Sequence, residues 1–201
     1  MLYIFDMGGV VTTTAQIDDE LCSMLGITTE EYYNFCGHEK NGIKSEYTTD
    51  LMDLYSNGII NTKEFYHAFS ARSEIEIKYD YFHNLYSPVL FKKTVQIINK
   101  LKEQGNRVVC GTNTWETYYN IHLERGDYRY FDKVYASNYL GVSKPNPDFW
   151  KLILQFEKAL PENTVFIDDR QKNIDAALKL GIKSILFESP EQLAKELKIT
   201  V

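Results

Sequence analysis

The sequence predicts an α/β fold in which a doubly wound parallel sheet carries a small helical cap inserted after the first strand. Three observations lead to this prediction. Short apolar runs end in polar residues, as strands buried on both faces of a parallel sheet do. Helical patterns with start and stop residues separate those runs, which is the order expected of a doubly wound sheet. Residues 15–85 interrupt the alternation with a stretch that is polar, aromatic and helical in pattern.

Three apolar runs are expected to form neighbouring strands: Leu2–Phe5, Arg107–Cys110 and Thr164–Ile167. Each run is followed directly by polar or glycine residues, which are Asp6 to Gly9, Gly111 to Asn113, and Asp168-Asp169. In open α/β sheets, ligands bind just outside the carboxyl ends of the strands. The three polar clusters are therefore expected to meet at one place.

The remaining core elements are predicted as helices over 90–104, 147–158 and 173–180, a strand over 183–187, and a final helix that starts at Pro190. Gly105 and Gly181 suit the left-handed stops that close the first and third of these helices. Ser189 before Pro190 is a typical helix start. These elements complete the strand–helix alternation of the predicted sheet.

The interrupting segment contains two capping-box signatures, Thr28 with Glu31 and Asn61 with Glu64. Neither is followed by a strand-like run, so the segment is expected to be a helical insertion. The chain is accordingly predicted to divide into a core of residues 1–14 and 86–201 and a cap of residues 15–85.

The charge and the apolar content restrict the partners. The 201 residues include 22 basic and 28 acidic side chains, and the formal net charge is −6. With no long Lys/Arg run, the chain lacks the basic surface that nucleic-acid binding requires, so nucleic acid is excluded as a main partner. No stretch approaches the roughly 20 apolar residues of a membrane span, and no membrane partner is expected.

The cysteine pattern and the N-terminal residues indicate the cellular compartment of the protein. Cys22, Cys36 and Cys110 are odd in number and match no zinc-site spacing, so neither a disulfide framework nor a metal knuckle is expected. The apolar opening meets Asp6 before it is long enough for a signal peptide. A reducing, cytoplasmic location fits these features best.

Four motifs in order resemble the haloacid dehalogenase superfamily, whose members are mostly magnesium-dependent phosphatases. The motifs are Leu2–Val11 around Asp6, Val108–Asn113, Gly141–Pro145 with Lys144, and Val165–Asp169 with Asn173 following. The resemblance runs essentially end to end, and the insertion lies where the small helical cap of that superfamily lies. It implies a Rossmann-like core, a phosphoric monoester hydrolase and a Mg²⁺ cofactor.

The resemblance also implies roles for individual residues. Asp6 is expected to take the phosphoryl group as an acyl phosphate, which splits one displacement into two easier steps. Lys144 and Thr112 are the other expected catalytic residues, because phosphoryl transfer needs positioning and charge neutralisation. The expected phosphate-binding residues are Thr112, Asn113, Lys144, Gly8 and Gly9. The expected oxygen ligands for Mg²⁺ are Asp6, the Gly8 carbonyl, Asp168 and Asp169.

One position departs from the family pattern. Phosphatases of this superfamily usually carry a second aspartate two residues after the nucleophile, and Gly8 occupies that position here. Proton transfer worth about 10²–10⁴-fold must then come from elsewhere. Three explanations stay open. The chain resembles a small-cap sugar-1-phosphate phosphatase subgroup with glycine there, whose leaving group needs less acid assistance; the cap supplies an acid, such as His38 or Glu39; or catalysis is weak or absent.

The expected function is a Mg²⁺-dependent phosphatase, monomeric or homodimeric, that hydrolyses a small phosphorylated metabolite, with a sugar phosphate as the best guess. The alternative is a phosphate-binding or interaction protein with little or no catalysis. A haloacid dehalogenase is less favoured. That reaction also uses the aspartate nucleophile but needs no metal, whereas the pair Asp168-Asp169 argues for one.

Overall fold

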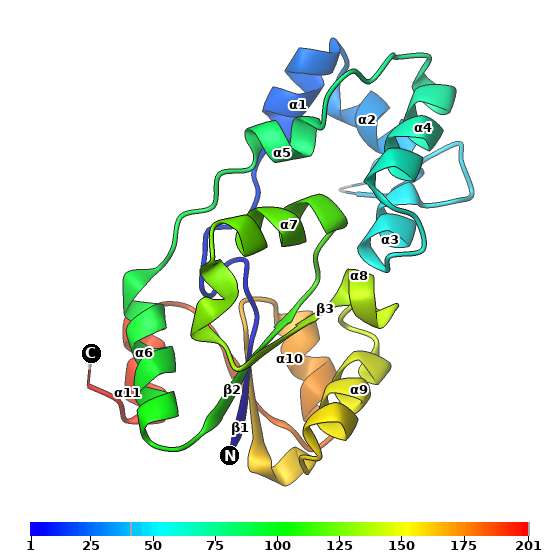
Figure 1. Cartoon of the computed structure of the whole chain (residues 1–201). Coiled ribbons are helices and arrows are strands. Elements are labelled where there is room, and N and C mark those ends of the chain that lie inside the picture. The colour runs from blue at the N-terminus through cyan, green and yellow to red at the C-terminus, as the bar shows by residue number, and fades with distance from the viewer. Residues whose placement is uncertain (41, 201) are drawn as a thin grey trace.

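The centre of the fold is a five-stranded, fully parallel sheet with the strand order β3-β2-β1-β4-β5 (Figure 1). The computed structural model describes residues 1–40 and 42–200. The strands are β1 Leu2–Phe5, β2 Arg107–Thr112, β3 Lys133–Ala136, β4 Thr164–Asp168 and β5 Lys183–Leu186. The chain runs outward from β1 in both directions, so the predicted doubly wound parallel sheet is confirmed.

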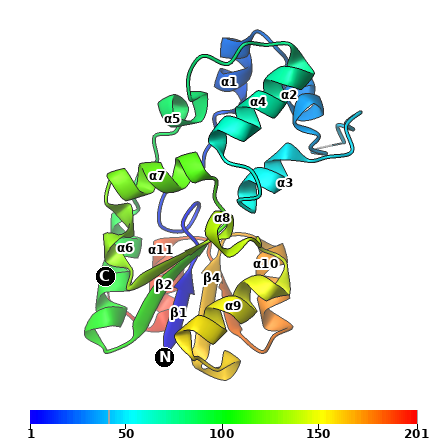
Figure 2. The same cartoon turned by 45° about the vertical axis from the view of Figure 1, so that its right-hand side comes forward.

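Helices cover both faces of this sheet (Figure 2). One face packs against α6 Lys92–Glu103 and α11 Pro190–Leu197, and the other packs against α9 Pro147–Glu157 and α10 Gln171–Leu178. Successive strand residues point to opposite faces. Phe5 therefore lies in the first core and Ile4 in the second.

The sheet differs from the prediction at one edge. The strand β3 was not predicted: its four residues begin with an exposed Lys133 and a half-buried Val134, and no helix-ending glycine directly precedes it, as Gly181 does β5. The short helices α7 Glu116–Glu124 and α8 Ser137–Leu140, next to this edge, were also not predicted. Two 3-10 turns, Asp127–Tyr130 and Pro161–Asn163, complete the core. An edge strand that pairs on one side needs less apolar character than a central one.

Five helices of the interrupting segment lie together above the carboxyl edge of the sheet (Figure 1). They are α1 Asp18–Leu25, α2 Thr29–Cys36, α3 Leu51–Ser56, α4 Thr62–Ser73 and α5 Tyr81–Leu85. Both predicted capping boxes form, at Thr28 and at Asn61. Aromatic rings dominate the core of this helical layer, as in the stacked pair Tyr55–Phe65, whose ring centroids lie 5.1 Å apart.

The chain enters and leaves the helical layer at one place. Thr13 N donates to Val89 O at 2.9 Å, and Val89 N donates to the Thr13 hydroxyl at 3.0 Å. Nearby, Phe91 N donates to Val11 O at 2.8 Å. The two connecting segments are thus hydrogen-bonded to each other.

Polar contacts also hold the helical layer over α7 and α8. The Thr62 hydroxyl donates to Glu116 Oε2 at 2.6 Å, and the Ser137 hydroxyl donates to Ser56 O at 2.6 Å. At Gly58, which has φ +65°, a Cβ atom would lie 1.9 Å from the backbone oxygen of Asn138, so only glycine permits this approach. Within residues 1–40 and 42–200, no helix has the length and apolar character to cross a bilayer.

Candidate active site

The carboxyl ends of β1, β2 and β4 bring the predicted site residues together. Phe5 of β1 pairs with Cys110 of β2 on one side and with Ile167 of β4 on the other. Asp6 follows β1 directly, and its backbone N donates to Ile167 O at 2.9 Å. The strand order reverses at β1, and ligands of doubly wound sheets bind at such a switch point.

A buried lysine joins two carboxylates at this point. Lys144 Nζ lies 2.9 Å from Asp6 Oδ1 and 2.7 Å from Asp168 Oδ2, and its side chain is 1% exposed. Burial alone would lower the pKa of Lys144, but the two neighbouring carboxylates outweigh burial and raise it. The lysine is therefore held as a cation between two strand ends.

The carboxylate of Asp6 has one oxygen engaged and one available. Its Oδ1 accepts from Met7 N at 2.8 Å and from Lys144. Within the described residues, Oδ2 has no hydrogen-bond or ion-pair partner. Burial raises the pKa of Asp6 to about 6, against the lowering effect of Lys144, and Asp168 raises it further. Asp6 thus presents one free oxygen to the pocket.

Asp168 is used to position its neighbours. Its Oδ1 accepts from Arg170 N at 2.9 Å and from Asn173 Nδ2 at 2.9 Å. Its Oδ2 accepts from Lys144 at 2.7 Å and from Asn173 Nδ2 at 3.1 Å. Both oxygens of this fully buried carboxylate are therefore already engaged.

Asp169 fits the expectation of a metal ligand more directly. Its Oδ1 is buried without a hydrogen-bond partner within the described residues. One oxygen from each of Asp6, Asp168 and Asp169 lies within 4.8 Å of the others. Burial, reinforced by Asp168, raises the pKa of Asp169. An unpartnered buried oxygen among clustered carboxylates suits a hard divalent cation such as Mg²⁺.

The two glycines after Asp6 differ in what they permit. Gly9 has φ +82°, and a Cβ atom there would lie 2.3 Å from Asp169 Oδ2. The chain can therefore approach Asp169 only because residue 9 is glycine. At Gly8, a Cβ would meet only Thr14, with its Cγ2 at 3.6 Å, which is ordinary contact. The missing carboxylate at position 8 is thus not imposed by lack of space for a Cβ.

The second motif lies beside the cluster. The buried Thr112 lines the pocket, and its hydroxyl donates only weakly, to Asn113 O at 3.3 Å. Asn113 also lines the pocket, but its side-chain amide is used by the backbone of Lys144. Its Nδ2 donates to Lys144 O at 2.8 Å, and its Oδ1 accepts from Lys144 N at 2.8 Å. In this arrangement the Asn113 side chain holds the lysine loop.

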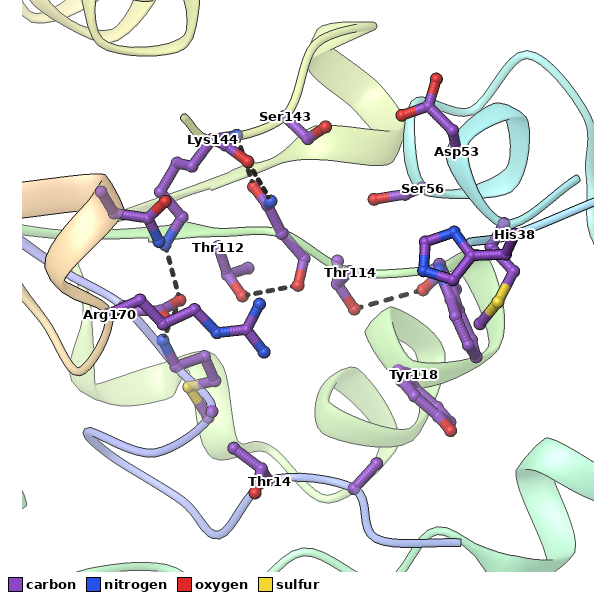
Figure 3. A pocket seen from close by; sticks show the side chains of 18 of the residues that line it. Thr14, His38, Asp53, Ser56, Thr112, Thr114, Tyr118, Ser143, Lys144 and Arg170 are labelled. Carbon is purple, nitrogen blue, oxygen red and sulfur yellow. Dashed lines mark hydrogen bonds and ion pairs between the residues drawn. The ribbon is translucent and has the colours of Figure 1, made fainter. Parts of the chain in front are cut away.

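A pocket of about 630 Å³ opens from these residues toward the helical layer (Figure 3). Its core wall includes Asp6, Gly8, Thr112, Asn113 and Lys144, and its opposite wall includes His38, Lys40, Asp50, Asp53 and Ser56. The aromatic side chains Tyr33, Tyr86, Trp115 and Tyr118 also line it. Charged and hydrogen-bonding groups on both walls, with aromatic faces between them, suit an organic ligand that carries several polar groups.

Sequence reasoning missed two groups in this pocket. Arg170 and Lys172 line it without a carboxylate partner within 4.0 Å in the described chain, and Figure 3 shows the Arg170 side chain extending into the pocket. Arg170 directly follows the aspartate pair, which was the available signal. Tyr86 and His122 are the second group, and they are hydrogen-bonded across 36 residues of sequence, which no local pattern reveals.

Of the two cap residues considered as acids, only one lines the pocket. His38 does so, and its Nδ1 lies 2.7 Å from Asp50 Oδ2. In Figure 3, His38 lies at the opposite end of the pocket from Lys144. Glu39 is exposed and is not among the lining residues.

Comparison with protein families identifies the fold's relatives. The model of the haloacid dehalogenase-like hydrolases matches residues 3–187, a range that includes the helical layer and all five strands except Leu2 of β1. The chain belongs to the haloacid dehalogenase-like hydrolase family. The cluster of Asp6, Lys144 and Asp168-Asp169 lies within the matched range.

Three curated relatives differ in how much of their own length this chain matches. A drimenol cyclase of Aspergillus calidoustus is 28% identical over 160 residues, which is 74% of this chain. Acyl-CoA dehydrogenase family member 10 of Mus musculus is 30% identical over 159 residues, or 72% of this chain. The matched part of this chain spans 30% and 14% of the lengths of those two relatives. A sesquiterpene phosphatase of Aspergillus oryzae is 25% identical over 185 residues, covering 89% of this chain and 85% of the relative.

Solved structures share the whole architecture. A family enzyme of Bacteroides thetaiotaomicron, solved in complex with magnesium and inorganic phosphate, superposes with a TM-score of 0.78. It is 19% identical, and the match covers 96% of this chain and 98% of that one. A phosphatase of Thermococcus onnurineus gives a TM-score of 0.67 at 16% identity, covering 98% and 97% of the two chains. At these identities the likeness establishes the fold.

Proposed function

We propose that this chain is a Mg²⁺-dependent phosphatase that hydrolyses a small phosphorylated metabolite through a phosphoryl group carried on Asp6. One observation carries the proposal. Lys144 is buried between Asp6 and Asp168 while Asp6 keeps one oxygen free toward a pocket of about 630 Å³. A fixed carboxylate nucleophile beside a fixed cation is what phosphoryl transfer requires.

The residues of the site would divide the work of the first step. Asp6 Oδ2 attacks phosphorus, and the bond between phosphorus and the leaving oxygen breaks. Lys144 holds the other oxygen of Asp6 and balances the incoming negative charge. The Thr112 hydroxyl, with its weak present partner, is free to turn and donate to a phosphate oxygen. Arg170 extends into the pocket and adds a second cation for the same group.

Asp6, the Gly8 carbonyl and Asp169 would hold the Mg²⁺, with Asp168 beside them. When bound, the ion supplies positive charge to the phosphate oxygens and aligns the phosphate with the nucleophile. The unpartnered Asp169 Oδ1 and the close approach of Gly9 support this assignment. In our proposal Asp168 contributes through Lys144 and Asn173, since its two oxygens are already engaged.

The substrate is proposed to be a monophosphate of a sugar or of a similarly sized alcohol. The pocket volume and its aromatic wall support this size class. A sesquiterpene phosphatase and, over 70 residues, a D-ribitol-5-phosphate phosphatase of Bacteroides thetaiotaomicron are among the relatives. Sugar phosphates and prenyl phosphates are therefore the two series to screen first. We further propose that residues 15–85 act as the cap and that the three free, buried cysteines reflect a reducing, cytoplasmic location.

The deciding experiment compares Asp6→Asn with the native chain. With p-nitrophenyl phosphate and Mg²⁺, the native chain is expected to release phosphate and the variant to release none above background, because an amide cannot form the acyl phosphate. Asp148→Asn, a surface carboxylate with a 62% exposed side chain, is the matched control and keeps native turnover. Native turnover in Asp6→Asn would overturn the assignment of the nucleophile.

The alternative, a phosphate-binding protein with little catalysis, is favoured by the glycine at position 8. It predicts that the native chain binds Mg²⁺ and inorganic phosphate, measured by calorimetry, but turns over no member of either phosphate series. Turnover that disappears when Mg²⁺ is removed by a chelator rejects this alternative and also rejects a metal-independent dehalogenase reaction.

A further inference from the structure

Three buried polar side chains form a hydrogen-bonded chain at the pocket wall. Tyr86 Oη lies 3.0 Å from His122 Nε2, and His122 Nδ1 lies 3.0 Å from Asp127 Oδ2. The three residues are 8%, 3% and 4% exposed in that order. Tyr86 and His122 line the same pocket as Asp6, yet the proposed function above assigns neither a role.

The direction of the hydrogen bonds follows from the chemistry of the three groups. An ionised carboxylate only accepts, so His122 Nδ1 carries the proton donated to Asp127. Burial lowers the pKa of His122, against the raising effect of Asp127, so the resting imidazole is neutral. Its Nε2 is then an acceptor, and the Tyr86 hydroxyl is the donor. Asp127 is held in place by Arg125, whose Nε lies 3.0 Å from the same oxygen.

This polarity leaves the Tyr86 oxygen able to accept a proton from the pocket side. Burial raises the pKa of Tyr86 to about 12, so its hydroxyl keeps its proton at rest. Tyr86 lines the same pocket as Asp6, and it lies three residues before Val89, which is hydrogen-bonded to Thr13 in the segment that follows Asp6. By contrast, His38 with its partner Asp50 stands at the far end of the pocket from Lys144.

We infer that Tyr86 and His122 form a proton relay that replaces the aspartate missing at position 8. The inference rests on the proposed function and concerns its second step, the hydrolysis of the phosphorylated Asp6. Tyr86 is the catalytic group that contacts water, and His122, oriented by Asp127, is the positioning residue behind it. The arrangement is a carboxylate–imidazole–hydroxyl series of the kind that activates hydroxyl groups in hydrolases.

The step balances as follows. A water proton passes to Tyr86 Oη while the Tyr86 proton passes to His122 Nε2. The water oxygen forms a bond to phosphorus, the bond between phosphorus and Asp6 breaks, and the electron pair restores the Asp6 carboxylate. His122 then releases its proton to solvent. That release offsets the proton that the departing alkoxide took from solvent in the first step.

The test separates the two steps in time. Tyr86→Phe and His122→Gln are mixed rapidly with p-nitrophenyl phosphate, whose leaving group needs no acid. Each variant is expected to release a burst of one nitrophenolate per site and then to turn over about 10²-fold more slowly than the native chain. Mass spectrometry of the quenched variants should show a phosphoryl group accumulating on Asp6. Hydroxylamine, a nucleophile that needs no deprotonation, should restore the steady rate.

The matched control is Tyr128→Phe. Tyr128 is buried next to His122, with ring centroids 5.6 Å apart, but it does not line the pocket, and its hydroxyl has no partner in the described residues. The same loss of a hydroxyl there should change neither the burst nor the steady rate. A rescue variant adds Gly8→Asp to Tyr86→Phe, at a position where a new Cβ makes only an ordinary contact, 3.6 Å from Thr14 Cγ2. Restored turnover without the burst is expected.

The outcomes distinguish this inference from the proposed function. If the native chain forms no phosphorylated Asp6 and turns over no phosphate, the proposed function fails and the relay fails with it. If the native chain is active but burst and steady rate fall together in both variants, the chain of hydrogen bonds is purely structural and the relay is wrong. Unchanged steady rates in folded Tyr86→Phe and His122→Gln, checked by circular dichroism, overturn it as well.

Discussion

The sheet end of the pocket and the helical layer each carry a lysine–aspartate pair, and the two pairs differ in burial. At the sheet, Lys144 is 1% exposed and lies 2.9 Å from Asp6 and 2.7 Å from Asp168. At the helical layer, Lys40 lies 3.0 Å from Asp18, but the two side chains are 43% and 40% exposed. The contact distances are similar, whereas the solvent around them is not. Water screens the second pair and barely reaches the first.

The buried ion pair is held rigidly, whereas the exposed ion pair is not. The buried pair is fixed by backbone groups, by Asn113 and by Asn173, so the charges cannot rearrange without breaking several hydrogen bonds. The exposed pair costs little to break, because the gain of a solvated ion pair is small. The sheet end therefore holds one rigid charge pattern, whereas the ion pair of the helical layer can rearrange easily.

The largest effect is expected from a substitution that breaks the buried ion pair. Lys144→Met leaves two buried carboxylates without their cation and should lower the free energy of unfolding of the metal-free chain by about 3–5 kcal/mol. Lys40→Met, the same change at the exposed pair, should cost about 0–1 kcal/mol after solvent screening. Urea unfolding at neutral pH with a chelator measures both. Equal losses would show that the two ends do not differ as described.

A smaller effect probes the close approach at Gly9. Gly9→Ala and Gly105→Ala place a side chain at nearly the same backbone conformation, φ +82° and +81°. At Gly105 no atom lies within 4 Å of the new Cβ, so that variant should lose only roughly 1–2 kcal/mol of stability. At Gly9 the new Cβ meets Asp169 at 2.3 Å, so Mg²⁺ affinity measured by calorimetry should also fall about tenfold or more, since ligand placement sets metal affinity. Unchanged Mg²⁺ affinity in Gly9→Ala would remove Asp169 from the proposed metal site.

The next prediction sharpens the charge pattern at the sheet end. Arg170→Ala should raise KM for p-nitrophenyl phosphate about tenfold, since a charged hydrogen bond is worth roughly 1.5–3 kcal/mol. The control Lys179→Ala removes a cation from the other end of α10, away from the pocket, and should leave KM unchanged. If both variants raised KM equally, the effect would come from the overall electrostatic field of the protein and not from a contact between Arg170 and the substrate.

The smallest effect concerns pH. Burial lowers the pKa of His122, so the folded chain holds it neutral. Below the ordinary histidine pKa of about 6.5, the unfolded chain binds a proton that the folded chain does not, and stability falls as the pH drops. His122→Gln should flatten the fall in unfolding free energy between pH 7 and 5, whereas His67→Gln, at an exposed position, should not. A steeper fall in His122→Gln would contradict the neutral assignment.

The central sheet was predictable because its strands are buried on both faces. Such strands read as apolar runs, and β1, β2 and β4 were found within one or two residues of their ends. The edge strand β3 was not predicted, whereas β5 at the other edge was, because β5 directly follows a helix that ends at Gly181 and no such signal directly precedes Lys133. The capping boxes of α2 and α4 were predictable because both partners lie within one helical turn.

The site was only partly predictable, for a related reason. Asp6, Thr112 and the aspartate pair stand in short motifs at strand ends, which the topology brings together, and Lys144 stands in a short motif in the loop before α9. Which hydrogen bonds each side chain forms depends on partners that are far away in sequence. The amide of Asn113, predicted to face phosphate, bonds to a residue 31 positions later, and Tyr86 bonds to His122 36 positions later. No local pattern contains such pairs.

The hydrogen bonds between Thr13 and Val89 have a consequence for how the molecule is assembled. They bring the start and the end of the inserted segment to a single point of the core. Since loop-closure entropy changes slowly with loop length, a shorter or longer insertion at that point alters the folding free energy of the sheet little. The insertion can therefore change in length or sequence while the sheet keeps its structure. If the proposed function holds, a change confined to one interval of the chain would alter the wall that faces Asp6 and leave the sheet edge itself intact.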